Sequence, residues 1–204
     1  MGFANAVNAP NEYHEILSMI RLDAEVGDIS LTFRKGEGLS VSFDGKEAVI
    51  EYQGNYCYRG LALLCERLNA GREPFHIKEE IAIPHLGAMY DVSRNMAMNI
   101  PYAKYRMRLM AIMGYNRFML YTEDMYELSD FPYFGHLRGR YTAEEIKELD
   151  DYALSLGMEL VPCMQAAAHL EHFFKWWGSG VMRDADDCLL VGEEKTYELL
   201  ETEL

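Results

Sequence analysis

The sequence has 204 residues and a mass of 23.5 kDa, with 50% hydrophobic and 25% charged residues, a composition that excludes a disordered chain. Its 33 acidic residues outnumber its 19 basic ones, and the formal net charge of −14 has the wrong sign for holding a phosphate backbone. No apolar run reaches the roughly 18 residues of a membrane span, and the N-terminus lacks the basic start of a signal peptide. We therefore expect a cytoplasmic protein whose partners include neither nucleic acid nor a membrane.

Residues 1–83 predict a small α+β domain. Apolar residues at helical spacing predict a short helix over 11–22. Alternating apolar and polar residues predict three strands, at 29–33, 39–43 and 48–52. Asp44-Gly45 between the last two is a strong hairpin signal, because glycine accepts the positive φ that a tight turn needs. A 3–4 spacing of apolar residues over 56–70, ending at Gly71, predicts a helix that covers one face of that sheet.

After Pro84 the pattern becomes a repeat of apolar strand, polar tip and amphipathic helix, which is typical of βαβ units. The predicted strands are 86–90, 117–121 and 159–164. The predicted apolar stripe of the first helix consists of Tyr102, Tyr105, Leu109, Ile112 and Met113. A capping box of Thr142 and Glu145 begins the second helix, whose stripe consists of Ile146, Leu149, Ala153 and Leu156. The fold class is therefore α/β, with a parallel sheet and helices outside it.

Residues 84–204 are about half of the roughly 250 residues that a closed (β/α)8 barrel takes. The last residues also read as part of a helix that begins near Gly192. We expect the N-terminal part of a TIM barrel, truncated, preceded by the small domain. Such a half barrel would leave strand edges and an inner face open, so poor solubility or self-association is expected.

In barrels of this kind the chemistry lies at the carboxyl ends of the strands. Each predicted strand end carries polar side chains: Asp91 and Arg94, then Glu123 and Asp124, then Gln165 and His169. The four cysteines form no C-x-x-C pair, and no histidine stands at metal-ligand spacing from them. Reduced thiols and no metal are the expectation.

Several motifs at these strand ends resemble family 20 glycoside hydrolases, the exo-β-N-acetylhexosaminidases, and look closest to the intracellular streptococcal and Paenibacillus-like branch. The motifs are Asp91-Val92-Ser93-Arg94-Asn95, residues 109–115 (LMAIMGY), residues 120–124 (LYTED), residues 132–135 (PYFG), residues 138–142 (RGRYT), and residues 161–170 (VPCMQAAAHL). They occur in the family's order over about residues 87–204. In that family a small α+β domain also precedes the barrel.

The resemblance implies a substrate-binding role for three residues. Arg94 falls where the family has an arginine that binds hydroxyls of the terminal sugar, a task that suits a rigid, always-charged guanidinium. Asp124 and His169 fall on positions associated with the pocket for the non-reducing-end sugar. The chain departs from the common pattern at Cys163 and Gln165, where the family has Glu and Asp, a variation that we associate with the intracellular branch.

The resemblance also implies the reaction, which is retaining hydrolysis of terminal β-linked GlcNAc or GalNAc. In this family the acetamido oxygen of the substrate is the nucleophile, an Asp orients the acetamido group, and the adjacent Glu is the general acid and base. That Asp-Glu pair follows the fourth strand and is expected beyond Leu204. No catalytic residue is therefore assigned, and no activity is expected of the 204 residues alone. No cofactor is implied; the partner is a small oligosaccharide or glycoconjugate, and a homodimer stays open.

Other interpretations remain open. Glu123-Asp124 could be the catalytic pair, although its order is reversed, and Asp91 with Arg94 could be a structural salt bridge. Asp91, Glu123 and His169 could be ligands of a metal-dependent barrel hydrolase. A third interpretation is a non-catalytic carbohydrate-binding remnant that uses Arg94 and aromatic residues. Two segments are either sugar-binding or merely packed: Phe173 to Trp177, and the loop bearing Tyr133, Phe134, Arg138 and Arg140.

Overall fold

The computed structural model describes residues 2–94 and 96–203. Asn95, which belongs to the first strand-end motif, and Leu204 lie outside the described residues. Contacts group the chain into two compact units that interleave along the sequence: Met1–Ala88 with Ala103–Phe118 and Asp151–Glu159, and Met89–Tyr102 with Met119–Asp150 and Leu160–Leu204. The predicted domain boundary between residues 83 and 84 stays a prediction.

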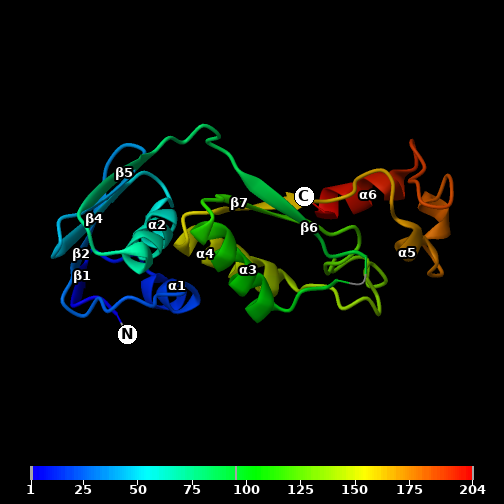
Figure 1. Cartoon of the computed structure of the whole chain (residues 1–204). Coiled ribbons are helices and arrows are strands. Elements are labelled where there is room, and N and C mark those ends of the chain that lie inside the picture. The colour runs from blue at the N-terminus through cyan, green and yellow to red at the C-terminus, as the bar shows by residue number, and fades with distance from the viewer. Residues whose placement is uncertain (1, 95, 204) are drawn as a thin grey trace. The chain divides into compact units, whose positions relative to one another are not determined.

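A five-stranded mixed sheet forms the centre of the first unit (Figure 1). Its strands are β1 (Asn5–Val7), β2 (Ser30–Lys35), β3 (Leu39–Phe43), β4 (Glu47–Tyr52) and β5 (Phe75–Glu79), in the order β1-β2-β4-β3-β5. β2 is parallel to β1 and β4, whereas β3 is antiparallel to β4 and β5. The three predicted strands are confirmed, and the sequence analysis missed the two edge strands.

The predicted hairpin at Asp44-Gly45 joins β3 and β4. Asp44 Oδ1 accepts hydrogen bonds from the backbone N–H groups of Lys46 and Glu47, at 2.9 and 2.8 Å. Gly45 has a φ of 108°, which a residue with a side chain rarely adopts. The aspartate and the glycine therefore specify the turn together.

Two helices accompany this sheet, α1 (Tyr13–Met19) and α2 (Cys57–Ala70), both predicted. Figure 1 shows α2 lying against the sheet, and its predicted stripe of Tyr58, Leu61, Leu64, Cys65 and Leu68 is buried. Gly60 permits the close approach of α2, because a Cβ there would lie 2.5 Å from Ile50 Cγ2. The core is apolar, and burial raises the pKa of the Cys57 and Cys65 thiols to about 12.

A second sheet contains β6 (Gly87–Asp91), β7 (Arg117–Tyr121) and β8 (Glu159–Cys163) in sequential order. Backbone hydrogen bonds join the beginnings of neighbouring strands: Arg117 N–H donates to the Leu86 carbonyl, and Glu159 N–H donates to the Asn116 carbonyl. Others join ends to ends, Val92 N to Tyr121 O and Thr122 N to Cys163 O, so the strands are parallel. α3 (Ile100–Ile112) and α4 (Ala143–Ser155) connect them in turn, as predicted.

The predicted stripe of α3 is wrong at three of its five positions, since only Leu109 and Ile112 are half-buried, whereas that of α4 is largely confirmed. Tyr102, Tyr105 and Met113 are 47%, 41% and 54% exposed. The buried face of α3 consists instead of Ala103, Met107, Met110 and Ala111. This helix has apolar residues around most of its circumference, so spacing alone could not select the face. In α4, Leu149, Ala153 and Leu156 are buried as predicted and Ile146 is half-buried.

Three further elements lie in the second unit: α5 (Glu171–Phe174), a short 3-10 helix η1 (Gly180–Met182) and α6 (Glu194–Glu203). They share a small core of buried side chains, namely Leu128, Phe134, Leu170, Phe173, Phe174, Met182, Leu189 and Leu199.

Among the described residues, no helix has the length and apolar character needed to cross a membrane. All four cysteines are free, and Cys163 and Cys188 are half-buried.

Candidate functional site

The loop after β6 presents Arg94 through a short chain of hydrogen bonds. Asp91 Oδ1 accepts bonds from the Ser93 N–H and the Ser93 hydroxyl, at 2.9 and 2.6 Å. The Ser93 oxygen in turn accepts a bond from Arg94 Nη1 at 3.0 Å. Asp91 therefore acts on Arg94 through Ser93, which differs from the direct Asp91–Arg94 salt bridge considered from sequence.

Arg94 pairs with Glu123 at the end of β7. Its Nη1 donates a hydrogen bond to Glu123 Oε1, and the Tyr121 hydroxyl donates to the same oxygen at 3.4 Å. Glu123 is 1% exposed, whereas the Arg94 side chain is 51% exposed and can meet a ligand. The hydrogen bond that Arg94 donates to Glu123 raises the pKa of Arg94 above its ordinary value, so this guanidinium stays charged.

Asp124, the next residue, pairs with a different arginine. Arg138 donates from Nη1 to Asp124 Oδ1 and from Nη2 to the Ser93 carbonyl. Its Nη1 also lies 3.8 Å from Glu123 Oε2. Asp124 is 1% exposed and the Arg138 side chain 12% exposed. Two buried carboxylates and two arginines thus form one charge network across the ends of β6 and β7.

Each carboxylate of this network keeps one oxygen free. Glu123 Oε2 and Asp124 Oδ2 are buried and accept no hydrogen bond from the described residues. Buried polar atoms nearly always have a partner, which is a protein group, a water or a ligand. The arrangement therefore combines acceptor oxygens with the donors of Arg94, and such a set can bind the hydroxyl groups of a small polar ligand.

The loop over 125–141 closes against this network at Gly135. Gly135 has a φ of 64°, and a Cβ there would lie 2.1 Å from the Asp124 carbonyl oxygen. Arg140 stabilises the loop from within: it bonds Glu127 Oε1 at 3.3 Å, the Pro132 carbonyl at 3.0 Å and also the Phe134 carbonyl. The Tyr141 hydroxyl donates to the Met98 carbonyl at 2.7 Å. The loop is therefore hydrogen-bonded and packed rather than merely solvated.

Residues with positive φ occur in the segments that follow β7 and β8. Within the described residues, positive φ outside glycine occurs at Asn8 and at three residues of the second unit: Glu123 at 48°, Leu137 at 61° and His169 at 62°. Such conformations are costly and cluster at functional sites. Their location supports a functional assignment of the strand ends.

His169 does not join the network. It is exposed, and within residues 2–94 and 96–203 no hydrogen bond or ion pair links it to Arg94 or Asp124. Its substrate-binding role, like those of Arg94 and Asp124, stays a prediction. Asp91, Glu123 and His169 are not arranged as metal ligands, since the described residues contain no group of three or more acidic, His or Cys side chains that could hold an ion.

The aromatic segment 173–177 divides between packing and exposure. Phe173 and Phe174 are buried in the small core of the second unit. Trp176 stacks on Tyr133 with ring centroids 5.8 Å apart, while Trp177 is 94% exposed. The packing interpretation therefore holds for the phenylalanines, and the tryptophans leave the sugar-platform interpretation open.

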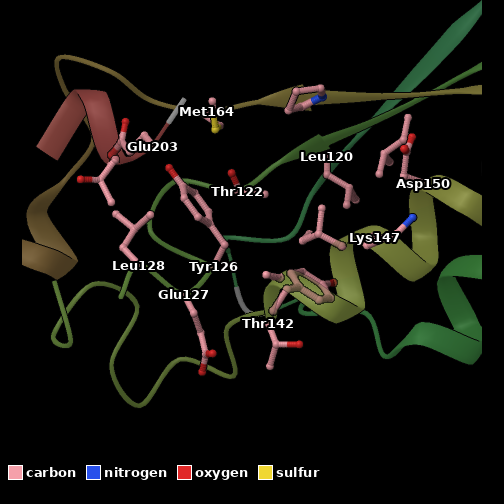
Figure 2. A pocket seen from close by; sticks show the side chains of 16 residues that line it. Leu120, Thr122, Tyr126, Glu127, Leu128, Thr142, Lys147, Asp150, Met164 and Glu203 are labelled. Atoms are coloured by element: carbon pink, nitrogen blue, oxygen red, sulfur yellow. The ribbon is translucent and has the colours of Figure 1, made fainter. Parts of the chain in front are cut away.

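A cavity of about 680 Å³ lies on the opposite side of the strands from Tyr121. Leu120, Thr122, Leu160 and Pro162 line it from the sheet, with α4 and the end of α6 around it. Figure 2 shows the Tyr126 side chain beside Leu128 and pointing toward Glu203. Because its lining is mostly apolar and excludes the Arg94–Glu123 and Asp124–Arg138 pairs, we regard it as part of the helix-packing layer rather than as the polar site.

Sequence reasoning missed the central position of Arg138 and the linking role of Ser93. Both stand in motifs that carried the family resemblance, so the motifs held a signal. Spacing alone could not show that residue 138 returns to residues 93 and 124, because that contact depends on the fold of the loop.

The sequence matches no family model and no curated protein. Solved structures do match. A Vibrio harveyi family 20 exo-β-N-acetylglucosaminidase, in complex with N-acetylglucosamine, aligns over 98% of this chain and 40% of its own, with 17% identity and a TM-score of 0.74. A mutant Streptomyces plicatus β-hexosaminidase in complex with its product GlcNAc aligns over 98% of this chain and 51% of its own, with 16% identity and a TM-score of 0.72. The Streptomyces coelicolor β-N-acetylhexosaminidase aligns over 99% of this chain and 52% of its own, with 18% identity and a TM-score of 0.70.

The chain has the fold of the N-terminal part of these enzymes. It spans between two fifths and about half of the neighbours' length. The predicted fold class is thereby confirmed: a small α+β arrangement comes first, followed by the first strands and helices of a (β/α)8 barrel. At these identities the likeness establishes the fold, and the activity has to be argued from the site.

Proposed function

We propose that this chain forms the sugar-binding part of an exo-β-N-acetylhexosaminidase of glycoside hydrolase family 20. The observation that carries the proposal is the pair of buried carboxylates, Glu123 and Asp124, each with one free oxygen, beside the half-exposed guanidinium of Arg94. A set of fixed acceptors and charged donors suits the hydroxyls of a terminal sugar. The fold places this set at the strand ends where barrel enzymes act.

The proposed reaction is removal of terminal β-linked GlcNAc or GalNAc by substrate-assisted, retaining hydrolysis. The sequence contains no Asp followed directly by Glu, so the proposal assigns neither the group that orients the acetamido nor the general acid to these 204 residues. Glu123-Asp124 does not fit that task, because both carboxylates are engaged by arginines and a general acid must hold a proton. Hydrolysis is therefore proposed for a longer protein that includes this chain.

The proposal also covers points that rest on sequence alone. We place the protein in the intracellular branch because of Cys163 and Gln165, and in the cytoplasm because four free cysteines suit a reducing compartment. His169 is included as a further contact to the terminal sugar. No cofactor is proposed.

Ligand-observed NMR with methyl β-N-acetylglucosaminide tests the sugar site in the 204-residue chain. We expect saturable binding that R94A weakens by about tenfold or more, the effect of losing a hydrogen bond from a charged donor. R34A is a matched control, because Arg34 is an exposed arginine on β2 with only a 3.9 Å ion pair to Glu51. Absence of binding, or equal weakening by both substitutions, would contradict the proposal.

An aryl β-N-acetylglucosaminide distinguishes the enzyme from a non-catalytic binding protein. The 94% exposure of Trp177 favours the binding alternative, because this ring is open to stack on a sugar, whereas the Tyr133 ring is already stacked on Trp176. We expect no turnover by the 204 residues and turnover by a longer protein that contains an Asp-Glu pair. Turnover by the 204-residue chain would show that its own residues include the general acid.

A further inference from the structure

We infer that Arg138 is a positioning residue for the sugar site, which fixes the Asp124 carboxylate and leaves one of its oxygens without a donor among the described residues. This inference rests on the proposed function, because it gives Asp124 its part in sugar binding. Arg138 is mostly buried, with a side chain that is 12% exposed, and both of its terminal guanidinium nitrogens donate to groups of the protein.

The contacts of Arg138 join the two segments that would contact the sugar. One guanidinium nitrogen donates to Asp124 Oδ1 at the end of β7, and the other donates to the Ser93 carbonyl in the loop after β6. Arg94 follows Ser93 directly in the chain. The spacing between the Arg94 guanidinium and the Asp124 carboxylate is therefore set through Arg138.

The same contacts determine which oxygen of Asp124 is available. Oδ1 is occupied by Arg138, whereas Oδ2 is buried and accepts nothing from the described residues. A planar guanidinium holds two acceptors in a fixed relation, which a lysine ammonium, acting as a point charge, cannot reproduce. Arg138 thus limits rotation of the carboxylate and leaves Oδ2 as the acceptor for a hydroxyl.

The charge pairing explains why the position requires an arginine. Glu123 and Asp124 are adjacent and both 1% exposed, and Arg94 already pairs with Glu123. Without Arg138, Asp124 would keep a buried charge with no direct counter-ion, and that carboxylate would turn toward water or toward Arg94. Either movement would remove the acceptor from the site.

Arg140 provides a matched control in the same loop. It is an arginine two residues further on, it bonds Glu127 and two loop carbonyls, and among the described residues no hydrogen bond or ion pair joins it to Asp124. A loss of loop order would appear in variants of both arginines. A loss of Asp124 positioning would appear only in variants of Arg138.

The experiment compares R138Q, R138K and R140Q in the 204-residue chain, with binding of methyl β-N-acetylglucosaminide measured by NMR and folding by circular dichroism. We expect R138Q to raise the dissociation constant by about tenfold or more, R138K to restore part of that loss, and R140Q to change it by less than about twofold. R138K serves as the test variant where R138Q does not fold. In a crystal structure of R138Q, the Asp124 carboxylate should have left its position.

The outcomes separate this inference from the proposed function. Unchanged binding in R138Q, when the unsubstituted chain binds, overturns the positioning role and leaves the sugar site intact. Equal weakening in R138Q and R140Q shows a general structural role and also overturns it. No binding by the unsubstituted chain refutes the proposed function, and the inference fails with it.

Discussion

At the residue scale, the site depends on the pairing of two buried carboxylates with two arginines. Arg94 forms an ion pair with Glu123 and Arg138 forms one with Asp124, so each carboxylate has a counter-ion. Breaking a buried pair by removing one partner typically costs about 3–5 kcal/mol, since the other charge stays buried. The same pairing leaves free oxygens on the carboxylates, and binding capacity and stability therefore depend on the same four side chains.

Gly135 offers a test of how closely the loop must approach β7. G135A adds a Cβ that would lie 2.1 Å from the Asp124 carbonyl oxygen, at a φ of 64°. We expect it to lower the free energy of unfolding by about 2 kcal/mol or more, because strain at positive φ adds to a backbone clash. Chemical denaturation measures the loss.

G139A is the control for that prediction. Gly139 also has a positive φ, 72°, but its Cβ would meet nothing within 4 Å. It should therefore show only the conformational cost of about 1 kcal/mol. If the two substitutions destabilise the protein equally, contact with Asp124 is not what requires glycine at 135.

At the element scale, α4 begins with a reciprocal cap directly after the site loop. The Glu145 N–H donates to Thr142 Oγ1 at 3.1 Å, and the Thr142 N–H donates to Glu145 Oε2 at 2.9 Å. We expect T142A and E145A each to lower the free energy of unfolding by about 1 kcal/mol. The double variant should lose less than the sum, because the two bonds support each other. Additive losses in a denaturation cycle would contradict a capping box.

The elements that sequence could predict are those with a strong local signal. Asp44-Gly45, the Thr142–Glu145 box and the stripe of α2 each produced the expected structure. β1 and β5 were missed because short edge strands acquire their identity from the neighbour with which they pair. The face of α3 was wrong because its apolar residues surround the helix, and tertiary packing selected the side with two alanines.

The candidate site could be predicted only in part for the same reason. Strand ends were expected to carry the chemistry, and the structure brings Arg94, Glu123 and Asp124 together there. The contact of Arg138 with Asp124 joins residues 14 positions apart, and it forms only because the loop between them folds back. No periodic pattern in the sequence encodes such a contact. His169 was selected by resemblance, and its exposed position in the described residues gives it no local partner that would confirm the choice.

At the scale of the whole molecule, the parallel sheet has two strands with a single neighbour. β6 and β8 each pair only with β7 in the described chain, and Met89 on β6 is 57% exposed. Unpaired strand edges with exposed apolar side chains favour association. We expect the 204-residue chain to associate with rising concentration, as measured by sedimentation velocity.

Two methionine variants test where that association occurs. M89K places a charge on the strand and should reduce association, whereas M113K changes a methionine of similar exposure, 54%, at the end of α3. If M113K reduces association as much as M89K, exposed apolar area in general is responsible rather than the strand edge.

The stability of the chain should also depend on pH through Glu203 at the end of α6. Burial raises the pKa of this carboxyl from 4.5 to about 7, and the neighbouring Tyr126 acts in the opposite direction. The folded protein therefore keeps a proton that the unfolded chain releases near its ordinary value, so the free energy of unfolding falls as pH rises from about 4.5 to about 7. The other titratable groups around the same cavity are Tyr126, Glu127, Tyr141, Lys147 and Asp150.

E203Q should remove this dependence, because glutamine stays neutral across the range. E201Q is the matched control: it removes the same negative charge from the same helix, but Glu201 is exposed. Thermal unfolding is measured at pH 5 and pH 8. We expect E203Q to unfold at a higher temperature than E201Q at pH 8 and at a similar temperature at pH 5. Equal gains for both variants would assign the effect to the net charge of −14 rather than to burial of Glu203.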